Sequence, residues 1–139
     1  MRWNECLKRN LVERKRRDKK LSFSLMKMAE KRIEFFASKE ISVFVLEGVY
    51  EAILELCHAF LALEGLKTLS HECAIEFLRE KNILKTSEVE FLHRLRRKRH
   101  KTKYYGLVID EQALRGYIES SLKIFTKLKN ALKNTLDYL

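Results

Sequence analysis

The stretch from Ser42 to Gly65 reads SVFVLEGVYEAILELCHAFLALEG, and it decides the fold class. Apolar residues recur in it at intervals of three and four, which is the spacing of one face of an α-helix. Ser42 is a suitable N-cap, and a glycine such as Gly65 commonly ends a helix. We therefore predict a long core helix, whose buried stripe consists of Val45, Val49, Ala52, Ile53, Leu56, Phe60 and Leu63.

Four glutamates of this helix lie off the apolar stripe. The simplest interpretation is a solvated face, since the charged side of an amphipathic helix usually faces water. The alternative is that this acidic face docks a basic helix of the same chain. We favour the solvated face for Glu47, Glu51, Glu55 and Glu64.

The rest of the chain repeats the helical pattern. It contains no proline and only four glycines, whereas strand-rich folds need such turn residues at regular intervals. A Ser87–Glu90 capping box is expected to open the helix that carries the basic residues, and Gly106 is expected to close it. The other expected helices span residues 21–36, 70–81 and 110–136.

These helices predict an all-α fold, an antiparallel up-and-down bundle of four core helices with a short helix and an N-terminal arm. The arm or the short helix would lie outside the core. We divide the chain into a basic arm or short helix over residues 1–19 and a bundle domain over residues 20–139. The basic run ERKRRDKK, residues 13–20, is expected to be a solvated tail.

Charge, cysteines and hydropathy limit the compartment and the cofactors. The net charge of +10 is concentrated in two basic zones that flank an acidic middle, a pattern suited to nucleic acid or nucleotides. Cys6, Cys57 and Cys73 are odd in number and lack CxxC spacing, so we expect no disulfide framework and no metal site. Without a signal peptide or an apolar run long enough to span a bilayer, the chain is expected to be soluble and cytoplasmic, without a cofactor.

The functional residues are expected between Phe91 and Gly106, where the chain reads FLHRLRRKRHKTKYYG, with seven cations and no carboxylate. Such cations repel one another on a helix unless an anion is bound, and phosphate is the anion that nucleic acids supply. Arg99 continues the apolar stripe of Leu92 and Leu95. A second face is formed by His93, Arg97, His100 and Tyr104.

These residue types suit metal-free cleavage of RNA. A histidine can take the proton of a ribose 2′-hydroxyl, an arginine can stabilise the charge on phosphorus, and a tyrosine can orient the ligand or stack on a base. The alternative interpretation is that the segment only neutralises phosphates, or that it faces solvent and the acidic helix.

The order of features resembles the HEPN domain (higher eukaryotes and prokaryotes nucleotide-binding) over about residues 20–136. The resemblance rests on VYEAILELCHAFLALEGLKTLSHECAIEFL, residues 49–78, and on LRRKRHKTKYYG, residues 95–106. It implies a helical bundle, a homodimer with one shared cleft, and RNA or nucleotide binding. Many members of the family are metal-independent endoribonucleases, often toxins encoded beside a nucleotidyltransferase antitoxin.

Carried over to this chain, the resemblance places Arg99 at the arginine of the family motif and His100 at the polar position after it. Tyr104 occupies the histidine position. Because a tyrosine with an ordinary pKa of about 10 is a poor general base, His100 takes the proton-transfer role in this scheme. The candidate catalytic residues are Arg99, His100 and Tyr104, and the candidate phosphate ligands are Arg96, Arg97, Lys103 and Tyr105.

The leading hypothesis is thus an RNA- or nucleotide-phosphate-binding homodimer of this type that can act as a metal-independent endoribonuclease. A second hypothesis is a non-catalytic module that docks a nucleotidyltransferase partner. A third is a basic helical protein that binds nucleic acid without specificity, with affinity spread evenly over Arg14 to Lys20 and Arg94 to Lys103 rather than focused on Arg99.

Overall fold

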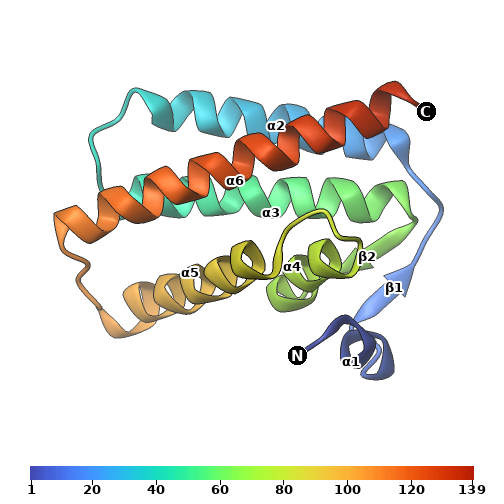
Figure 1. Ribbon diagram of the computed structural model, residues 1–139, viewed down its shortest axis with the longest axis horizontal. Coiled ribbons are helices and arrows are strands. Elements are labelled where there is room, and N and C mark those ends of the chain that lie inside the picture. Colours follow the sequence, from blue (N-terminus) through green and yellow to red (C-terminus); the bar gives the residue numbers. More distant parts are fainter.

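The computed structural model describes residues 1–139 and is built from six helices and two short strands (Figure 1). Consecutive long helices run in opposite directions, so the prediction of an all-α helical bundle is confirmed. None of the helices combines the length and the apolar composition needed to cross a bilayer. In chain order the elements are α1 (Trp3–Lys8), β1 (Val12–Arg14), α2 (Lys19–Ala37), α3 (Val43–Leu63), β2 (Leu66–Thr68), α4 (His71–Glu80), α5 (Thr86–Tyr105) and α6 (Glu111–Asp137).

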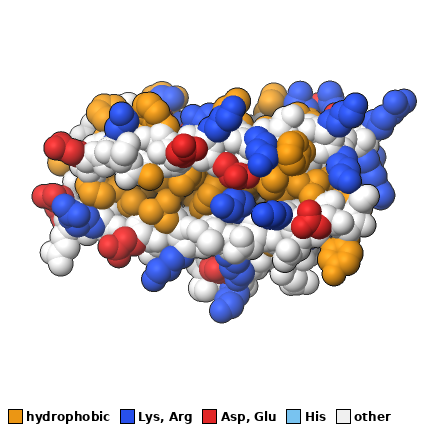
Figure 2. Space-filling view, turned by 90° about the horizontal axis from the view of Figure 1, so that it is seen from above, with side chains coloured by type: hydrophobic (Ala, Val, Ile, Leu, Met, Phe, Trp, Pro, Cys, Tyr) orange, Lys and Arg blue, Asp and Glu red, His pale blue; other side chains and the backbone are white.

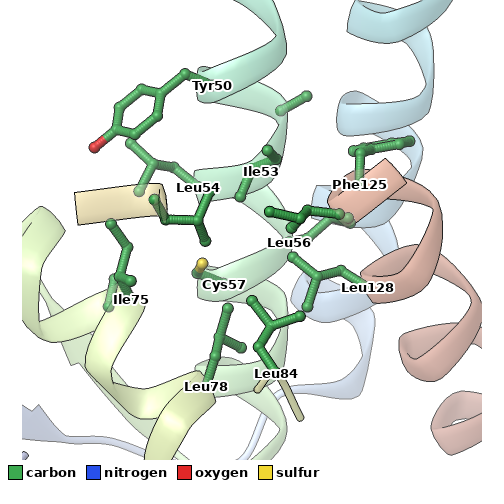
Figure 3. Packing of buried hydrophobic residues seen from close by; sticks show 14 of the residues in the cluster. Tyr50, Ile53, Leu54, Leu56, Cys57, Ile75, Leu78, Leu84, Phe125 and Leu128 are labelled. Carbon is green, nitrogen blue, oxygen red and sulfur yellow. The ribbon is translucent and has the colours of Figure 1, made fainter. Parts of the chain in front are cut away.

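Helix α3 is the centre of the bundle. Figure 3 shows Leu56 and Cys57 of α3 between side chains of α4, such as Leu78, and side chains of α6, such as Leu128. Because α2, α4 and α6 surround α3, the helix buries residues well beyond the predicted stripe, including Leu54. The sequence therefore located the core helix correctly but underestimated how much of its circumference is enclosed.

Several helix ends follow the local signals in the sequence. The hydroxyl of Ser42 accepts a hydrogen bond from the Val45 amide, and Gly106 adopts the left-handed conformation that ends α5. The predicted Ser87–Glu90 capping box is wrong. Helix α5 begins at Thr86, and its N-cap is Lys85, whose amide donates to the Glu88 carboxylate. Glu90 instead forms an ion pair with Arg79.

The N-terminal residues pack against α4. Trp3 lies with its ring 5.2 Å from that of Phe77, and a disulfide joins Cys6 of α1 to Cys73 of α4. The expectation of no disulfide framework is wrong for this pair, which lies 67 residues apart and meets only in the folded chain, while Cys57 is free. Six of the ten residues of α4 are buried, so the short helix belongs to the core.

Strands β1 and β2 form a small antiparallel pair that fixes the start of the basic N-terminal run. In the register of this pair, Val12 faces Thr68 and Arg14 faces Leu66. Beyond the strands, the Lys15 amide donates to the Gly65 carbonyl at 2.7 Å. The run is solvated as expected, since residues 13–20 are all exposed, but it is not a free tail, because its backbone is bonded to the end of α3 and to β2.

Candidate functional site

A basic depression lies where the C-terminal half of α5 meets the start of α4. Its volume is about 700 Å³. Four cations line it against a single carboxylate, so positive charge is in excess. Its lining consists of Ser70, His71, Glu72, Arg96, Arg97, Arg99, His100, Lys101, Tyr104 and Tyr105.

The structure brings most of the sequence-predicted residues together here. Of the seven candidate catalytic and phosphate-binding residues, all except Lys103 line the basic depression. Lys103 instead lines an apolar hollow between the start of α3 and the end of α5, beside Val43 and Phe44. His93, expected on the same face as His100, is buried with Nε2 2.6 Å from Glu76 Oε2 and is not displayed.

Arg99 extends the buried stripe of α5 as expected, and it meets the acidic face of α3. Its Nη2 donates to Glu51 Oε1 at 3.0 Å and lies 3.5 Å from Glu47 Oε1, while its guanidinium lies over the Tyr50 ring. Its Nε is buried and has no partner. Arg99 is therefore already paired within the chain, and a phosphate that binds it must share the guanidinium with Glu51.

The acidic face of α3 thus docks cations, and the favoured prediction of a solvated face is wrong for Glu51 and Glu55, while Glu64, the C-cap of α3, is exposed. Glu55 accepts from Arg32 of α2 at 2.8 Å, and Glu64 lies 2.8 Å from Lys81 at the end of α4. The physical reason is that α3 is surrounded by other helices, so even its polar positions face neighbouring side chains.

Arg96 and Arg97 are less engaged than Arg99. The closest carboxylate oxygen to Arg96 Nη2 is Glu72 Oε1 at 3.8 Å, and Arg96 Nε is buried without a partner. Glu72 is already bonded by the N-terminal amine of Met1 at 2.8 Å, which is the main reason its pKa is lowered. Arg97 is exposed and forms no ion pair. Of the three arginines in the depression, these two are the more available to an anion, and Lys101 is also exposed and forms no ion pair.

Aromatic rings border the depression on the solvent side. The His100 ring lies 4.7 Å from the ring of Tyr104 and 5.9 Å from that of Tyr105, measured between centroids. Tyr104 is 63% exposed and Tyr105 is 77% exposed. Exposed rings next to cations are the usual platform on which single-stranded bases stack.

His71 is the residue of this site that the candidate set lacked. Its Nδ1 is hydrogen-bonded to the Tyr50 hydroxyl at 3.3 Å, which orients the ring and leaves Nε2 without a protein partner. Burial lowers its pKa, nearby Arg99 and Arg96 lower it further, and Glu51 opposes them. His71 is thus neutral at neutral pH, as a general base must be.

No local signal in the sequence points to this role. His71 is the first residue of α4, and only the packing of α4 against α5 brings it to Arg96 and Arg99. A histidine directly after an N-cap serine is otherwise unremarkable.

No group of three or more histidine, cysteine, aspartate or glutamate side chains is arranged to hold a metal ion.

A second basic surface lies between the start of α2 and the end of α6. Seen from above, hydrophobic side chains form a band there, with Lys and Arg on both sides (Figure 2). Its lysines are Lys19, Lys20, Lys27, Lys129 and Lys133, without arginine, histidine or tyrosine, so it offers charge but little further chemistry.

Comparison of the chain with protein-family models, with curated proteins and with solved structures finds no match. The HEPN resemblance, the homodimer and the nucleotidyltransferase partner therefore stay predictions.

Proposed function

We propose that the chain binds RNA through the phosphates that enter the basic depression. The observation that supports this most strongly is the pair of buried, unpartnered Nε atoms of Arg96 and Arg99 beside a surface with excess positive charge. Buried donors are nearly always bonded, so two free donors at one site favour a missing acceptor. Phosphate oxygens match the donor geometry of a guanidinium group, and nucleic acids supply them at regular intervals.

In this proposal each side chain has a distinct role. Arg96 and Arg97 bind the phosphate, because neither is held by a close ion pair. Tyr104 and Tyr105 offer stacking surfaces for the bases. Arg99, whose Nη2 donates to Glu51 at the edge of the depression, offers its free Nε to the same phosphate.

RNA cleavage is a second candidate function, favoured by the presence of two histidines in the one depression. A neutral His71 can take the 2′-hydroxyl proton, after which the 2′-oxygen attacks phosphorus and the bond to the 5′-oxygen breaks. His100, when protonated, can return a proton to the leaving 5′-oxygen. The products are a 2′,3′-cyclic phosphate and a 5′-hydroxyl end, and the reaction needs no metal.

Binding is tested by fluorescence polarisation of a labelled single-stranded RNA of about five nucleotides, a length typical of one single-strand binding site. We expect the double variant Arg96→Ala, Arg97→Ala to bind at least about tenfold more weakly than the wild type. The matched control is Lys129→Ala, Lys133→Ala, which removes the same charge from the α2–α6 surface. Equal losses in both variants would favour non-specific binding and contradict the proposal.

Cleavage is tested separately with EDTA present. A substrate with a single ribose among deoxyriboses should be cut only after that ribose, because the reaction needs its 2′-hydroxyl. His71→Gln should abolish the cyclic-phosphate product, while Lys129→Ala, Lys133→Ala should not change its rate. Absence of any product with the wild type removes this second candidate and leaves the binding proposal standing.

A further inference from the structure

A second basic depression adjoins the first at His71, and its volume is about 670 Å³. Its rim carries Lys15 and Arg16 from the N-terminal run and Lys67 from β2. Its apolar floor comes from the start of α2, the end of α3 and β2. The floor consists of Leu21, Leu25, Ala62 and Leu66, and the depression is also lined by Leu69, which is 90% exposed.

The N-terminal run forms a fixed wall of this second depression. The Lys15 amide donates to the Gly65 carbonyl at 2.7 Å, and the Asp18 amide donates to the Ala62 carbonyl at 3.0 Å. The Asp18 side chain caps α2 by accepting from the Leu21 amide. Gly65 has a positive φ of 69°, and a Cβ there would lie 2.4 Å from the Lys15 carbonyl oxygen, so only glycine allows this close approach.

The two depressions adjoin each other at His71, which lines both. His58 lines the second one, and burial lowers its pKa, with a further decrease caused by nearby His71. Both rings are therefore neutral at neutral pH and can donate or accept hydrogen bonds between the two groups of cations. The cations of α5 and those of the N-terminal run thus border two neighbouring depressions that meet at His71.

We infer that the ligand is a single-stranded polynucleotide that runs from the α5 depression past His71 and His58 to Lys15, Arg16 and Lys67. This inference rests on the proposed function and specifies its substrate. A strand alternates phosphates with apolar bases, and the second depression pairs cations with an apolar floor in the same way. A mononucleotide or a free phosphate ion would occupy only one of the two depressions.

The test measures affinity against ligand length. We compare single-stranded RNAs of about three and about ten nucleotides, lengths chosen to fill one depression or both. The wild type should bind the longer RNA at least about tenfold more tightly, because additional phosphates are neutralised. In the triple variant Lys15→Ala, Arg16→Ala, Lys67→Ala that gain should fall to about twofold, while the trinucleotide keeps its wild-type affinity.

The matched control is Lys20→Ala, Lys129→Ala, Lys133→Ala, which removes three cations of the α2–α6 surface and should preserve the gain with length. An equal reduction of the gain in both triple variants overturns the inference. So does a trinucleotide that binds and depends on Arg96 and Arg97 while the longer RNA gains nothing. If the trinucleotide binds without depending on these arginines, the proposed function itself fails.

Discussion

Arg99 Nη2 lies 3.0 Å from Glu51 Oε1, which joins the end of α5 to the acidic face of the central helix. Glu47 lies slightly farther from the same nitrogen, and the guanidinium covers the Tyr50 ring. The Tyr50 hydroxyl in turn bonds His71, and in Figure 3 it points away from the hydrophobic cluster. Arg99 and Tyr50 thus connect the basic end of α5 with His71 of the candidate site.

The first prediction concerns this ion pair. Arg99→Ala and Glu51→Ala should each destabilise the fold, and a double-mutant cycle should give a coupling energy of about 1 kcal/mol, because both side chains are partly buried. Urea denaturation provides the measurement. Arg94→Ala is the control, since Arg94 is exposed on the same helix and forms no ion pair. Strictly additive effects of the two substitutions would show that the contact contributes nothing.

The second prediction concerns the buried Glu76 between α4 and α5. Glu76 accepts from Arg79 Nε at 3.0 Å and lies 2.6 Å from His93 Nε2. Glu76→Ala would leave the buried His93 without its partner and Arg79 with Glu90 alone, so it should cost about 2 kcal/mol or more of unfolding free energy. Glu80→Ala, at an exposed position of the same helix, should change it by less than about 0.5 kcal/mol. A similar small effect of both variants would contradict this structure of the α4–α5 interface.

The third prediction concerns the cysteines. The native protein should give no reaction with a thiol reagent, because Cys57 is buried with its pKa raised to about 12 and the other two cysteines are bonded. Unfolding without reductant should expose one thiol per chain, and a count of three would rule out the disulfide. Reduction should lower stability by about 2–4 kcal/mol in the wild type, since the bond closes a long loop. It should have no such effect in Cys6→Ser, Cys73→Ser.

The fourth prediction concerns pH. His58 and His71 have lowered pKa values in the folded chain, chiefly because of burial, so the unfolded chain binds protons more readily. Stability should therefore be complete above the unfolded pKa of about 6.5 and should decrease as pH falls below it towards the folded values. Denaturation of the wild type and of His58→Gln, His71→Gln between about pH 7 and pH 5 measures this.

The double variant should show a flatter pH profile in that range. The carboxylates with lowered pKa values, Glu72, Glu88 and Glu90, lose their contribution only as pH falls below about 4.3, so they do not interfere. A wild-type profile as flat as that of the variant would show that the two histidines titrate normally.

Local signals explain what could be read from the sequence. The stripe from Val45 to Leu63 and the cap at Ser42 depend only on residues within a few positions of one another, and they predicted the central helix well. The basic segment was found in the same way, since its charge density is visible in the sequence. Six of the seven candidate residues consequently line one depression.

Contacts between distant residues explain what could not be predicted. Glu51 and Arg99 are 48 positions apart, and Cys6 and Cys73 are 67 apart, so neither pair leaves a pattern in the sequence. The role of His71 depends on how α4 meets α5. The N-terminal run forms a wall only because Gly65, far along the chain, allows its backbone to approach.

The central claim, that RNA enters the depression between α4 and α5, is tested most directly by backbone amide NMR of the full chain during titration with a short single-stranded RNA. We expect the largest shift changes at residues 70–72 and 96–105, with little change at residues 19–27 and 129–137 of the α2–α6 surface. Changes centred on the α2–α6 lysines, or spread evenly over all basic residues, would contradict the account.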